Sequence, residues 1–268
     1  MGKMAAVLKS VTRETLKKLD LAIVRQSDLK KLTEDRDAAA GKVTRFLEVV
    51  LGPTDERAGL LLKTMENSRA QLRQDLFVLS ELGFKRKGFF VEFGATNGID
   101  LSNTFLLETR FNWNGILAEP ARCWYDSLRT NRRGPIETCC VWSESNSTVT
   151  FNEAEVAELS TVATVKSAEY FDRSRKKGST YDVHTISLND LLAKYDAPKE
   201  IDYLSIDTEG SEFDVLRNFD FDRYTIKVIT CEHNFTPTRE SVNELLTSHG
   251  YVRKFEELSD FDDWYTKA

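Results

Sequence analysis

The chain has 268 residues, 41% hydrophobic and 30% charged, a balance typical of a soluble globular protein with a substantial core. The formal net charge of −6 is unevenly spread, about +4 on residues 1–80 and about −10 on residues 81–268, and an acidic main part disfavours nucleic acid as a partner. No stretch approaches the roughly 20 apolar residues of a membrane-spanning helix, so we expect no transmembrane segment.

Apolar residues recur at helical spacing through residues 1–80, beginning with Leu8, Val11 and Leu16. The pattern predicts an N-terminal helical extension over residues 1–80, followed by the main domain over residues 81–268. Stripes of this kind usually pack on a main domain or between subunits. The pattern therefore leaves two roles open for these helices, packing on the main domain or forming a homodimer.

Strands and helices alternate after Gly88. The predicted strands are 89–94, 115–119, 136–142, 148–151, 183–187, 201–206 and 226–232. The predicted helices are 102–111, 121–131, 188–195, 211–219 and 239–249. This alternation predicts an α/β fold with a doubly wound, mostly parallel sheet. Residues 152–182 are polar and irregular, and we expect a functional lid there.

A sharp glycine turn follows the first predicted strand. The apolar run from Phe89 to Phe93 leads into Gly94 and Gly98, where glycine allows backbone to approach a ligand closely. Ligands of open parallel sheets bind at the carboxyl ends of the strands. The turn therefore predicts a nucleotide-like ligand.

Glu119 ends the next strand, about 25 residues later, where a carboxylate can accept both hydrogens of a ribose diol. That placement fits NAD and S-adenosylmethionine equally. The glycines do not form the G-x-G-x-x-G of a dinucleotide site, and Glu92 and Asp100 would repel a pyrophosphate. The same carboxylates suit a sulfonium and an α-amino group, which favours S-adenosylmethionine.

Four cysteines complete the composition: Cys123, Cys139, Cys140 and Cys231. None has metal-ligand spacing such as C-x-x-C, and the pair at 139 and 140 lies in an apolar run that predicts buried, reduced thiols. We therefore expect a cytoplasmic protein.

Three stretches of the sequence form a recognisable set. The first is the run from Val91 to Gly98 with Ser102, Asn103 and Thr104 downstream, and the second is the run from Gly115 to Pro120. The third is the run from Ile206 to Leu216, which contains the more specific D-x-E-G-x-E-x-x-V-L block. With these stretches the chain resembles the FkbM-type methyltransferases of class I, and the likeness covers roughly residues 69–255.

The resemblance implies a Rossmann-like fold, S-adenosylmethionine as donor and methylation of a hydroxyl oxygen, often on a sugar of a surface glycan or on a secondary metabolite. The residues assigned to the cofactor site are Glu92, Phe93, Gly94, Ala95, Asn97, Gly98, Ser102, Asn103, Thr104, Glu119, Pro120, Cys140, Val141 and Asp207.

The candidates for proton transfer from the acceptor are Asp207, Glu209, Glu232 and His233. His233 is the favoured general base, because imidazole titrates near neutrality and the residue follows a strand end. Asp207 and Glu209 could instead hold Mg²⁺ together with Glu232. No metal site is assigned.

Two alternatives to an active methyltransferase stay open at this stage. One is a non-catalytic module that keeps the fold for binding or scaffolding, and the other is an NAD-dependent oxidoreductase. The glycine pattern disfavours the oxidoreductase, and intact acids at both strand ends, at Glu119 and Asp207, disfavour the scaffold.

Overall fold

The computed structural model describes residues 45–46, 50, 57–165 and 174–268. The chain divides into a unit of residues 1–49 and a unit of residues 50–268, and every element with defined bounds belongs to the second. The helices predicted before residue 45, and with them most of the surface predicted for a homodimer, lie outside the described residues. Helices α3 (Ala58–Met65) and α4 (Gln74–Glu81) are present as predicted.

The main sheet has seven strands in the order β10-β11-β9-β8-β1-β2-β3. These strands are β1 (Phe89–Phe93), β2 (Asn114–Ala118), β3 (Ile136–Glu137), β8 (Glu200–Ile206), β9 (Thr225–Glu232), β10 (Tyr251–Lys254) and β11 (Asp262–Lys267). The five strands from β3 to β9 are parallel, whereas β11 runs antiparallel to both of its neighbours. The predicted mixed α/β fold with a mostly parallel sheet is thus confirmed.

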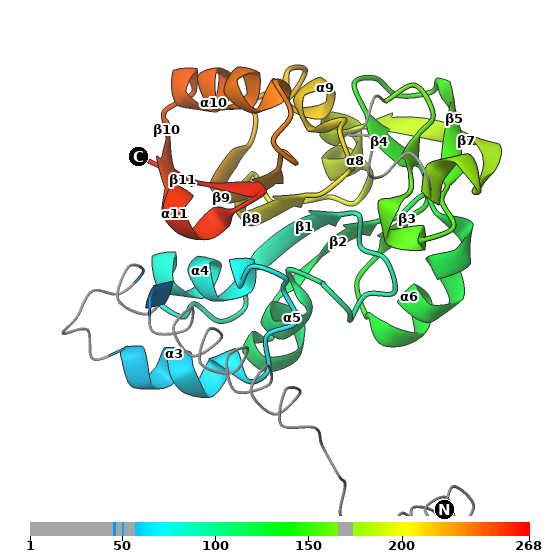
Figure 1. Ribbon diagram of the computed structural model, residues 1–268. Helices are drawn as coiled ribbons and strands as arrows, with labels where there is room; N and C mark the ends of the chain where they lie inside the picture. The colour runs from blue at the N-terminus through cyan, green and yellow to red at the C-terminus, as the bar shows by residue number, and fades with distance from the viewer. Residues whose placement is uncertain (1–44, 47–49, 51–56, 166–173) are drawn as a thin grey trace, which may run out of the picture. The chain divides into compact units, whose positions relative to one another are not determined.

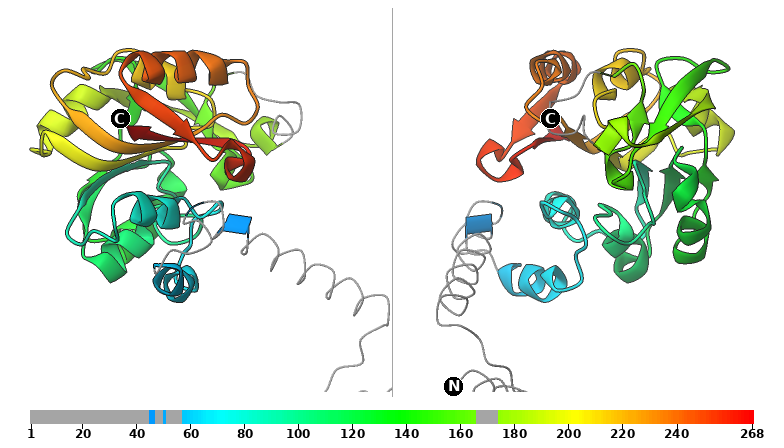
Figure 2. Two further views of the ribbon diagram at one scale, coloured as in Figure 1. Left: turned by 90° about the vertical axis from the view of Figure 1, so that its left-hand side faces the viewer. Right: turned by 45° about the vertical axis from the view of Figure 1, so that its right-hand side comes forward.

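Helices cover both faces of this sheet, as expected for a doubly wound fold. The remaining helices are the 3₁₀-helix η1 (Arg122–Trp124), α5 (Phe105–Phe111), α6 (Tyr125–Asn131), α8 (Leu188–Lys194), α9 (Glu212–Leu216), α10 (Thr238–Ser248) and α11 (Glu256–Ser259). Helices α4, α5 and α6 lie on one side of the sheet, and α9 and α10 lie on the other (Figures 1 and 2). The chain order reverses where β1 and β8 pair, which is where a ligand crevice is expected.

The central strands are buried on both faces, and this explains their continuous apolar sequences. Val91 and Phe93 of β1, Ile116 of β2, Leu204 of β8 and Ile229 of β9 belong to one core cluster. Burial of this kind supplies the main stabilisation of the sheet, at about 25 cal/mol for each Å² of apolar surface removed from water.

A smaller sheet is inserted between β3 and β8, in the order β4-β7-β5-β6. Its strands are β4 (Cys140–Trp142), β5 (Thr148–Glu153), β6 (Thr161–Val162) and β7 (Ser179–Ser187). Phe151, Val162 and Val183 from these strands pack with Cys140 and Ala121 in a separate apolar cluster. The inserted sheet therefore has its own core beside β2.

The single strand predicted over residues 136–142 is wrong. Residues 136–137 form β3 in the main sheet, while residues 140–142 form β4 in the inserted sheet. The break has a local cause: Glu137 Oε1 accepts hydrogen bonds from the backbone N–H groups of Thr138 and Cys139. That carboxylate replaces strand partners at the bend and turns the chain into the second sheet.

The segment predicted to be an irregular lid, residues 152–182, carries ordered elements where it is described. It contains the end of β5, the 3₁₀-helix η2 (Ala157–Leu159), β6 and the start of β7. Residues 166–173 lie outside the described part. Strands β10 and β11 were not predicted. None of the described helices combines the length and apolarity needed to cross a membrane.

Candidate functional site

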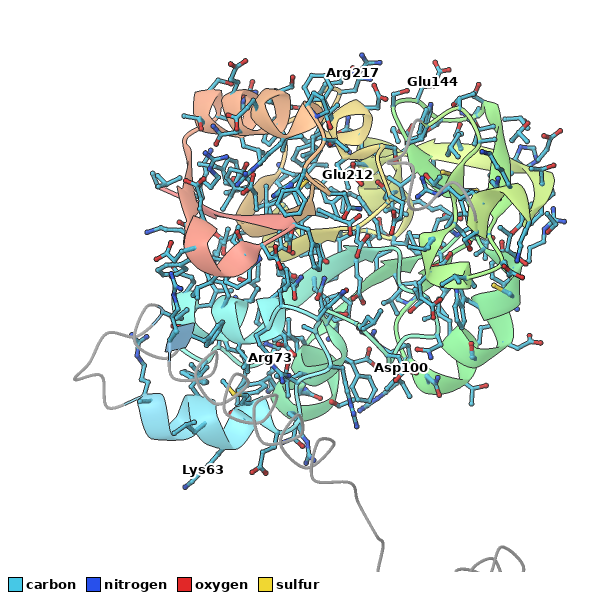
Figure 3. The ribbon with its side chains drawn as sticks, in the orientation of Figure 1. Lys63, Arg73, Asp100, Glu144, Glu212 and Arg217 are labelled. Atoms are coloured by element: carbon cyan, nitrogen blue, oxygen red, sulfur yellow. The ribbon has the colours of Figure 1, made fainter. Side chains whose placement is uncertain are left out.

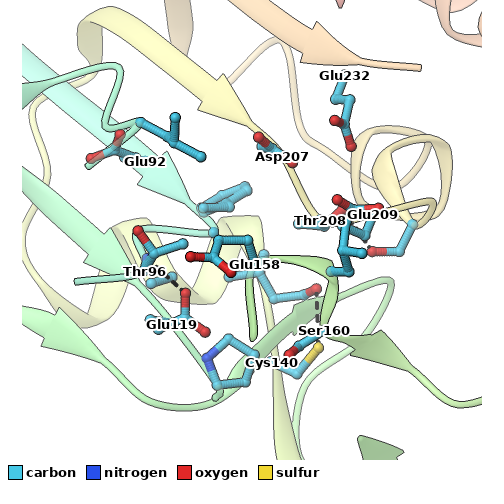
Figure 4. A pocket seen from close by; sticks show the side chains of 18 of the residues that line it. Glu92, Thr96, Glu119, Cys140, Glu158, Ser160, Asp207, Thr208, Glu209 and Glu232 are labelled. Atoms are coloured by element: carbon cyan, nitrogen blue, oxygen red, sulfur yellow. Dashed lines mark hydrogen bonds between the residues drawn. The ribbon is translucent and has the colours of Figure 1, made fainter. Parts of the chain in front are cut away.

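A cavity of about 290 Å³ opens at the carboxyl ends of β1, β2, β8 and β9, where the sheet order reverses. Its lining includes Gly94 after β1, Glu119 after β2, Asp207 after β8 and Glu232 at the end of β9. Figure 4 shows Glu119, Asp207 and Glu232 around one space. The volume lies near the lower end of the range of small-molecule sites.

Gly94 allows the ends of β1 and β8 to meet. Its φ is +72°, and a Cβ placed there would lie 2.1 Å from the backbone oxygen of Asp207. The backbone N–H groups of Gly94 and Ala95 both donate to the oxygen of Ala118 at the end of β2. Only glycine fits this position, because a side chain would collide with backbone. The turn therefore brings three strand ends together.

Glu92, predicted to face the cofactor, is held by the protein. Its carboxylate accepts hydrogen bonds from the hydroxyls of Ser102 and Thr104 and from the backbone N–H of Asn103. It also lies 3.3 Å from Arg132 Nη1 in a buried ion pair. Because Arg132 pairs its charge, Glu92 does not offer a free negative charge to a ligand. Its main role is to order the loop after β1.

Glu119 is oriented toward a ligand by the backbone around it. Its Oε2 accepts from the N–H of Thr96 at 2.8 Å (Figure 4). Its Oε1 accepts from the N–H of Ala121 at 2.8 Å. Each oxygen keeps a lone pair for a further donor. Burial raises the pKa of this carboxyl to about 7. Two parallel acceptors at the cavity wall match the two hydroxyls of a ribose.

Three carboxyl groups converge on the other side of the cavity. One oxygen each from Asp207, Glu209 and Glu232 lies within 4.8 Å of the others. Burial raises the pKa of all three, to about 6 for Asp207 and about 8 for Glu209. The contact between the Asp207 and Glu232 carboxyl groups partly offsets the effect of burial on the pKa of Asp207, and it raises the pKa of Glu232 further. This is the pattern expected when the two groups share a proton and Glu232 holds it.

The turn from Asp207 to Glu212 holds this acidic cluster in place. Glu212 Oε1 accepts from the backbone N–H groups of Thr208 and Gly210 and from the Thr208 hydroxyl. Figure 3 marks Glu212 inside the molecule and Arg217 at its surface. Glu209 has a φ of +59° and pairs with Arg175 Nη2 at 2.9 Å. A non-glycine residue in this conformation is a strain commonly found at functional sites.

The inserted sheet closes the cavity on the side of Glu119. Cys140 and Val141 of β4, Phe151 of β5 and Val162 of β6 line it with apolar surface. An apolar wall beside a ribose site suits a purine ring. Burial raises the pKa of the Cys140 thiol to about 12, so this cysteine serves as an apolar contact and not as a nucleophile.

His233 does not line the cavity. The residue is buried, its Nδ1 accepts from the N–H of Phe235, and its Nε2 lies 3.8 Å from Asp263 Oδ1 on β11. Burial lowers its pKa. Successive residues along a strand point to opposite faces, so Glu232 reaches the cavity and His233 does not. This placement does not support the predicted role of His233 as general base.

Most of the other predicted site residues do line the cavity. They are Glu92, Phe93, Gly94, Asn103, Glu119, Pro120, Cys140, Val141, Asp207, Glu209 and Glu232. Five residues assigned to the cofactor lie behind this lining instead: Ala95, Asn97, Gly98, Ser102 and Thr104. Their contacts shape the loop, as when Asn97 Oδ1 accepts from the N–H groups of Ile99 and Asp100.

Sequence reasoning missed several lining residues, among them Gln71, Glu158, Ser160, Asn234 and Phe261. Glu158 and Ser160 lie in the segment predicted as a lid, so its polar, irregular composition was the available signal. Gln71 and Phe261 lie far from the motifs in sequence, and no local pattern indicates them.

Comparison with known proteins gives a family match over most of this region. The profile of the family described as "Methyltransferase FkbM domain" matches residues 92–264. None of the curated proteins compared with the chain matches it. A precorrin-6y C5,15-methyltransferase from Geobacter metallireducens is 14% identical, with a TM-score of 0.38, and the match covers 72% of this chain and 87% of that chain. A SAM-dependent methyltransferase from Aquifex aeolicus is 10% identical, with a TM-score of 0.36, and the match covers 77% and 97%.

Proposed function

The chain belongs to the FkbM methyltransferase family and is a methyltransferase dependent on S-adenosylmethionine, and we propose that it methylates a hydroxyl oxygen of a sugar, a glycan or a secondary metabolite. The family match agrees with the resemblance seen in the motifs around Gly94 and Asp207. What supports the finer proposal is the pairing of a ribose-binding geometry at Glu119 with a buried acid cluster across the same cavity.

The proposed cofactor pose follows from these two sides. Glu119 would bind the ribose diol, with the adenine against the apolar wall that includes Cys140 and Phe151. The methionine part would then extend toward Asp207, where carboxylates suit the sulfonium and the α-amino group. The acceptor would enter from the side of Glu209 and Glu232.

The reaction is an in-line displacement at the methyl carbon. S-adenosylmethionine would supply the electrophilic methyl group for the new bond to the acceptor oxygen, and S-adenosylhomocysteine would be the leaving group that takes the electron pair of the broken carbon–sulfur bond. The hydroxyl proton passes to the carboxyl pair of Asp207 and Glu232, which carries one negative charge when it shares one proton. Asp207, with its pKa of about 6, is the ionised member at neutral pH.

Calorimetric titration with S-adenosylhomocysteine tests the cofactor assignment. We expect micromolar binding of this product and no binding of NADH, since the Gly94 turn lacks a pyrophosphate site. Binding of NADH alone would overturn the assignment. Binding of neither would favour the non-catalytic scaffold.

Asp207→Asn tests the proposed base. The amide keeps the volume but carries no charge, so turnover of the first acceptor found in a screen of sugars should fall about 10²- to 10⁴-fold. The rate of the unsubstituted enzyme should rise with pH through about 6, as Asp207 ionises, and the variant should lose this dependence. Release of S-adenosylhomocysteine gives the rate.

His233→Gln is the matched control for Asp207→Asn. His233 lies one residue beyond Glu232 in the sequence. The variant should retain turnover, because His233 faces Asp263 and not the cavity. Loss of turnover in this variant, with Asp207→Asn still active, would restore His233 as the base.

Mg²⁺ binding is a second candidate role for the acid cluster. Hard divalent ions bind carboxylate oxygens, and three such oxygens lie within 4.8 Å of one another here. One oxygen of the cluster, Glu232 Oε2, is buried and has no hydrogen-bond partner. If the cluster binds the ion, millimolar MgCl₂ should raise the melting temperature after treatment with EDTA, and Glu209→Gln should abolish the rise. An unchanged melting temperature would exclude this role.

We further propose that the protein acts in the cytoplasm and does not use nucleic acid as its acceptor. The cavity lining supports the second point, because no lysine, arginine or histidine contributes to it among the described residues. All four cysteines are free thiols, which is in keeping with a reducing compartment.

A further inference from the structure

Three large apolar side chains are exposed on loops that form the cavity. Leu101, 47% exposed, lines the cavity itself. Val156, 49% exposed, precedes the lining residue Ala157. Phe235, 68% exposed, follows the lining residue Asn234. We refer to Leu101, Val156 and Phe235 as the apolar rim. Large exposed apolar groups gathered near a polar cavity usually mark a binding surface.

Two residues of the apolar rim are held in an unfavourable backbone conformation. Leu101 has a φ of +61° and Phe235 a φ of +55°, in the left-handed region that glycine and asparagine favour. Both side chains stay exposed, although the Phe235 ring also packs edge-to-face against His233, with 5.4 Å between the ring centroids. Strained residues with exposed apolar side chains are readily explained if they contact a ligand.

The cavity inside the apolar rim has the opposite character. Among its described lining residues the charged side chains are all carboxylic acids, since the Cys140 thiol stays protonated, and Gln71, Ser160 and Asn234 add uncharged hydrogen-bonding groups. A phosphate or carboxylate on the acceptor would meet repulsion from the ionised Asp207. The reacting end of the acceptor should therefore be a hydroxylated group without negative charge.

Together these observations describe an acceptor with two unlike ends. We propose that the acceptor is a small amphiphile whose uncharged, hydroxylated head enters the cavity while its apolar segment packs on the apolar rim. The proposal rests on the proposed methyl transfer to oxygen and narrows its substrate class. The apolar rim would contribute affinity by removing apolar surface from water, and the cavity would orient the hydroxyl.

The test compares two glucosides that differ only in their apolar segment. The full chain is saturated with S-adenosylhomocysteine and titrated with hexyl β-D-glucoside, below its micelle-forming concentration, and with methyl β-D-glucoside. We expect the hexyl compound to bind about tenfold more tightly or better, since five added methylenes become buried. No measurable binding of the hexyl compound, or equal affinities for the two, would overturn the proposal.

Phe235→Asn separates a ligand contact from a structural role. Asparagine tolerates a positive φ, so the variant should melt no lower than the unsubstituted protein, yet bind hexyl glucoside about threefold to tenfold more weakly. Leu60→Asn on α3 is the matched control, since Leu60 is an exposed apolar residue, 47% exposed like Leu101, but does not line the cavity. A lower melting temperature for Phe235→Asn, or equal weakening by Leu60→Asn, would contradict a specific contact.

The two proposals fail in different ways. If S-adenosylhomocysteine does not bind at the first step, the proposed function fails. If it binds and the glucosides do not differ, only the amphiphile proposal fails.

Discussion

Glu119→Gln should weaken S-adenosylhomocysteine binding by about a hundredfold or more while the protein stays folded. The two carboxylate oxygens already accept from the N–H groups of Thr96 and Ala121, and both also serve the ribose hydroxyls in the proposed pose. An amide offers only one oxygen, so one ribose hydroxyl loses its acceptor and one backbone N–H faces another donor. Hydrogen bonds to a charged group are worth about 1.5–3 kcal/mol each. Calorimetric titration measures the change.

Glu137→Gln provides the matched control. Glu137 ends the neighbouring strand β3, is equally buried, and also accepts from two backbone N–H groups, those of Thr138 and Cys139. It does not line the cavity. Binding should therefore stay within about twofold of the unsubstituted protein. Equal losses in the two variants would mean that the effect of Glu119→Gln comes from disturbed folding and not from a lost ribose contact.

Arg132→Met should destabilise the fold by about 3–5 kcal/mol, the largest stability effect that we expect from a single substitution. The Arg132 side chain is completely buried and pairs with two carboxylates, Glu108 at 2.6 Å and Glu92 at 3.3 Å. It also donates to Thr104 Oγ1 and to the backbone oxygen of Gly98. Removing the guanidinium leaves both acids buried without a counter-charge. Chemical denaturation followed by circular dichroism measures the loss.

Arg133→Met is the control for this substitution. Arg133 lies 3.7 Å from the same Glu108 carboxylate, but its side chain is 74% exposed, and exposed ion pairs contribute less than about 1 kcal/mol. We expect a change of about 0.5 kcal/mol or less. If Arg132→Met cost no more than this control, the buried ion pairs would not be what holds the loop after β1.

The Arg132 network also explains why the loop at Gly94 is a preformed site. Glu92 on β1 and Glu108 on α5 are joined through one side chain at the end of α6. Ser102 and Thr104 bind the Glu92 carboxylate and so fix the chain between β1 and α5. Ser102 and Thr104, which the motif assigned to the cofactor site, thus act indirectly, because they hold in place residues that line the cavity.

The local sequence predicted the elements that build the site. Short apolar runs predicted β1, β2, β8 and β9, because strands of a parallel sheet are buried on both faces. Acidic residues directly after such runs predicted Glu119 and Asp207 at one edge of the sheet, because carboxyl ends of parallel strands meet there. The motifs around them also indicated the family.

Contacts between distant parts of the chain decided the rest. The bend at Glu137 splits one apolar run between two sheets, and Phe261, the residue before β11, joins the cavity lining from near the C-terminus. His233 lies beside Asp263 of β11 and not in the cavity lining, a placement that depends on the pairing of β9 with β11 and not on local sequence.

Sequence by itself therefore determined the fold class, the strand ends and the donor, since these follow from local apolar pattern and from motifs. Only the tertiary structure decided which acids remain free for a ligand. Glu92 is paired by Arg132, 40 residues away, whereas no basic side chain among the described residues pairs with Glu119 or Asp207. The physical reason is that the charge and the pKa of a carboxyl group depend on burial and on neighbours that only folding brings together.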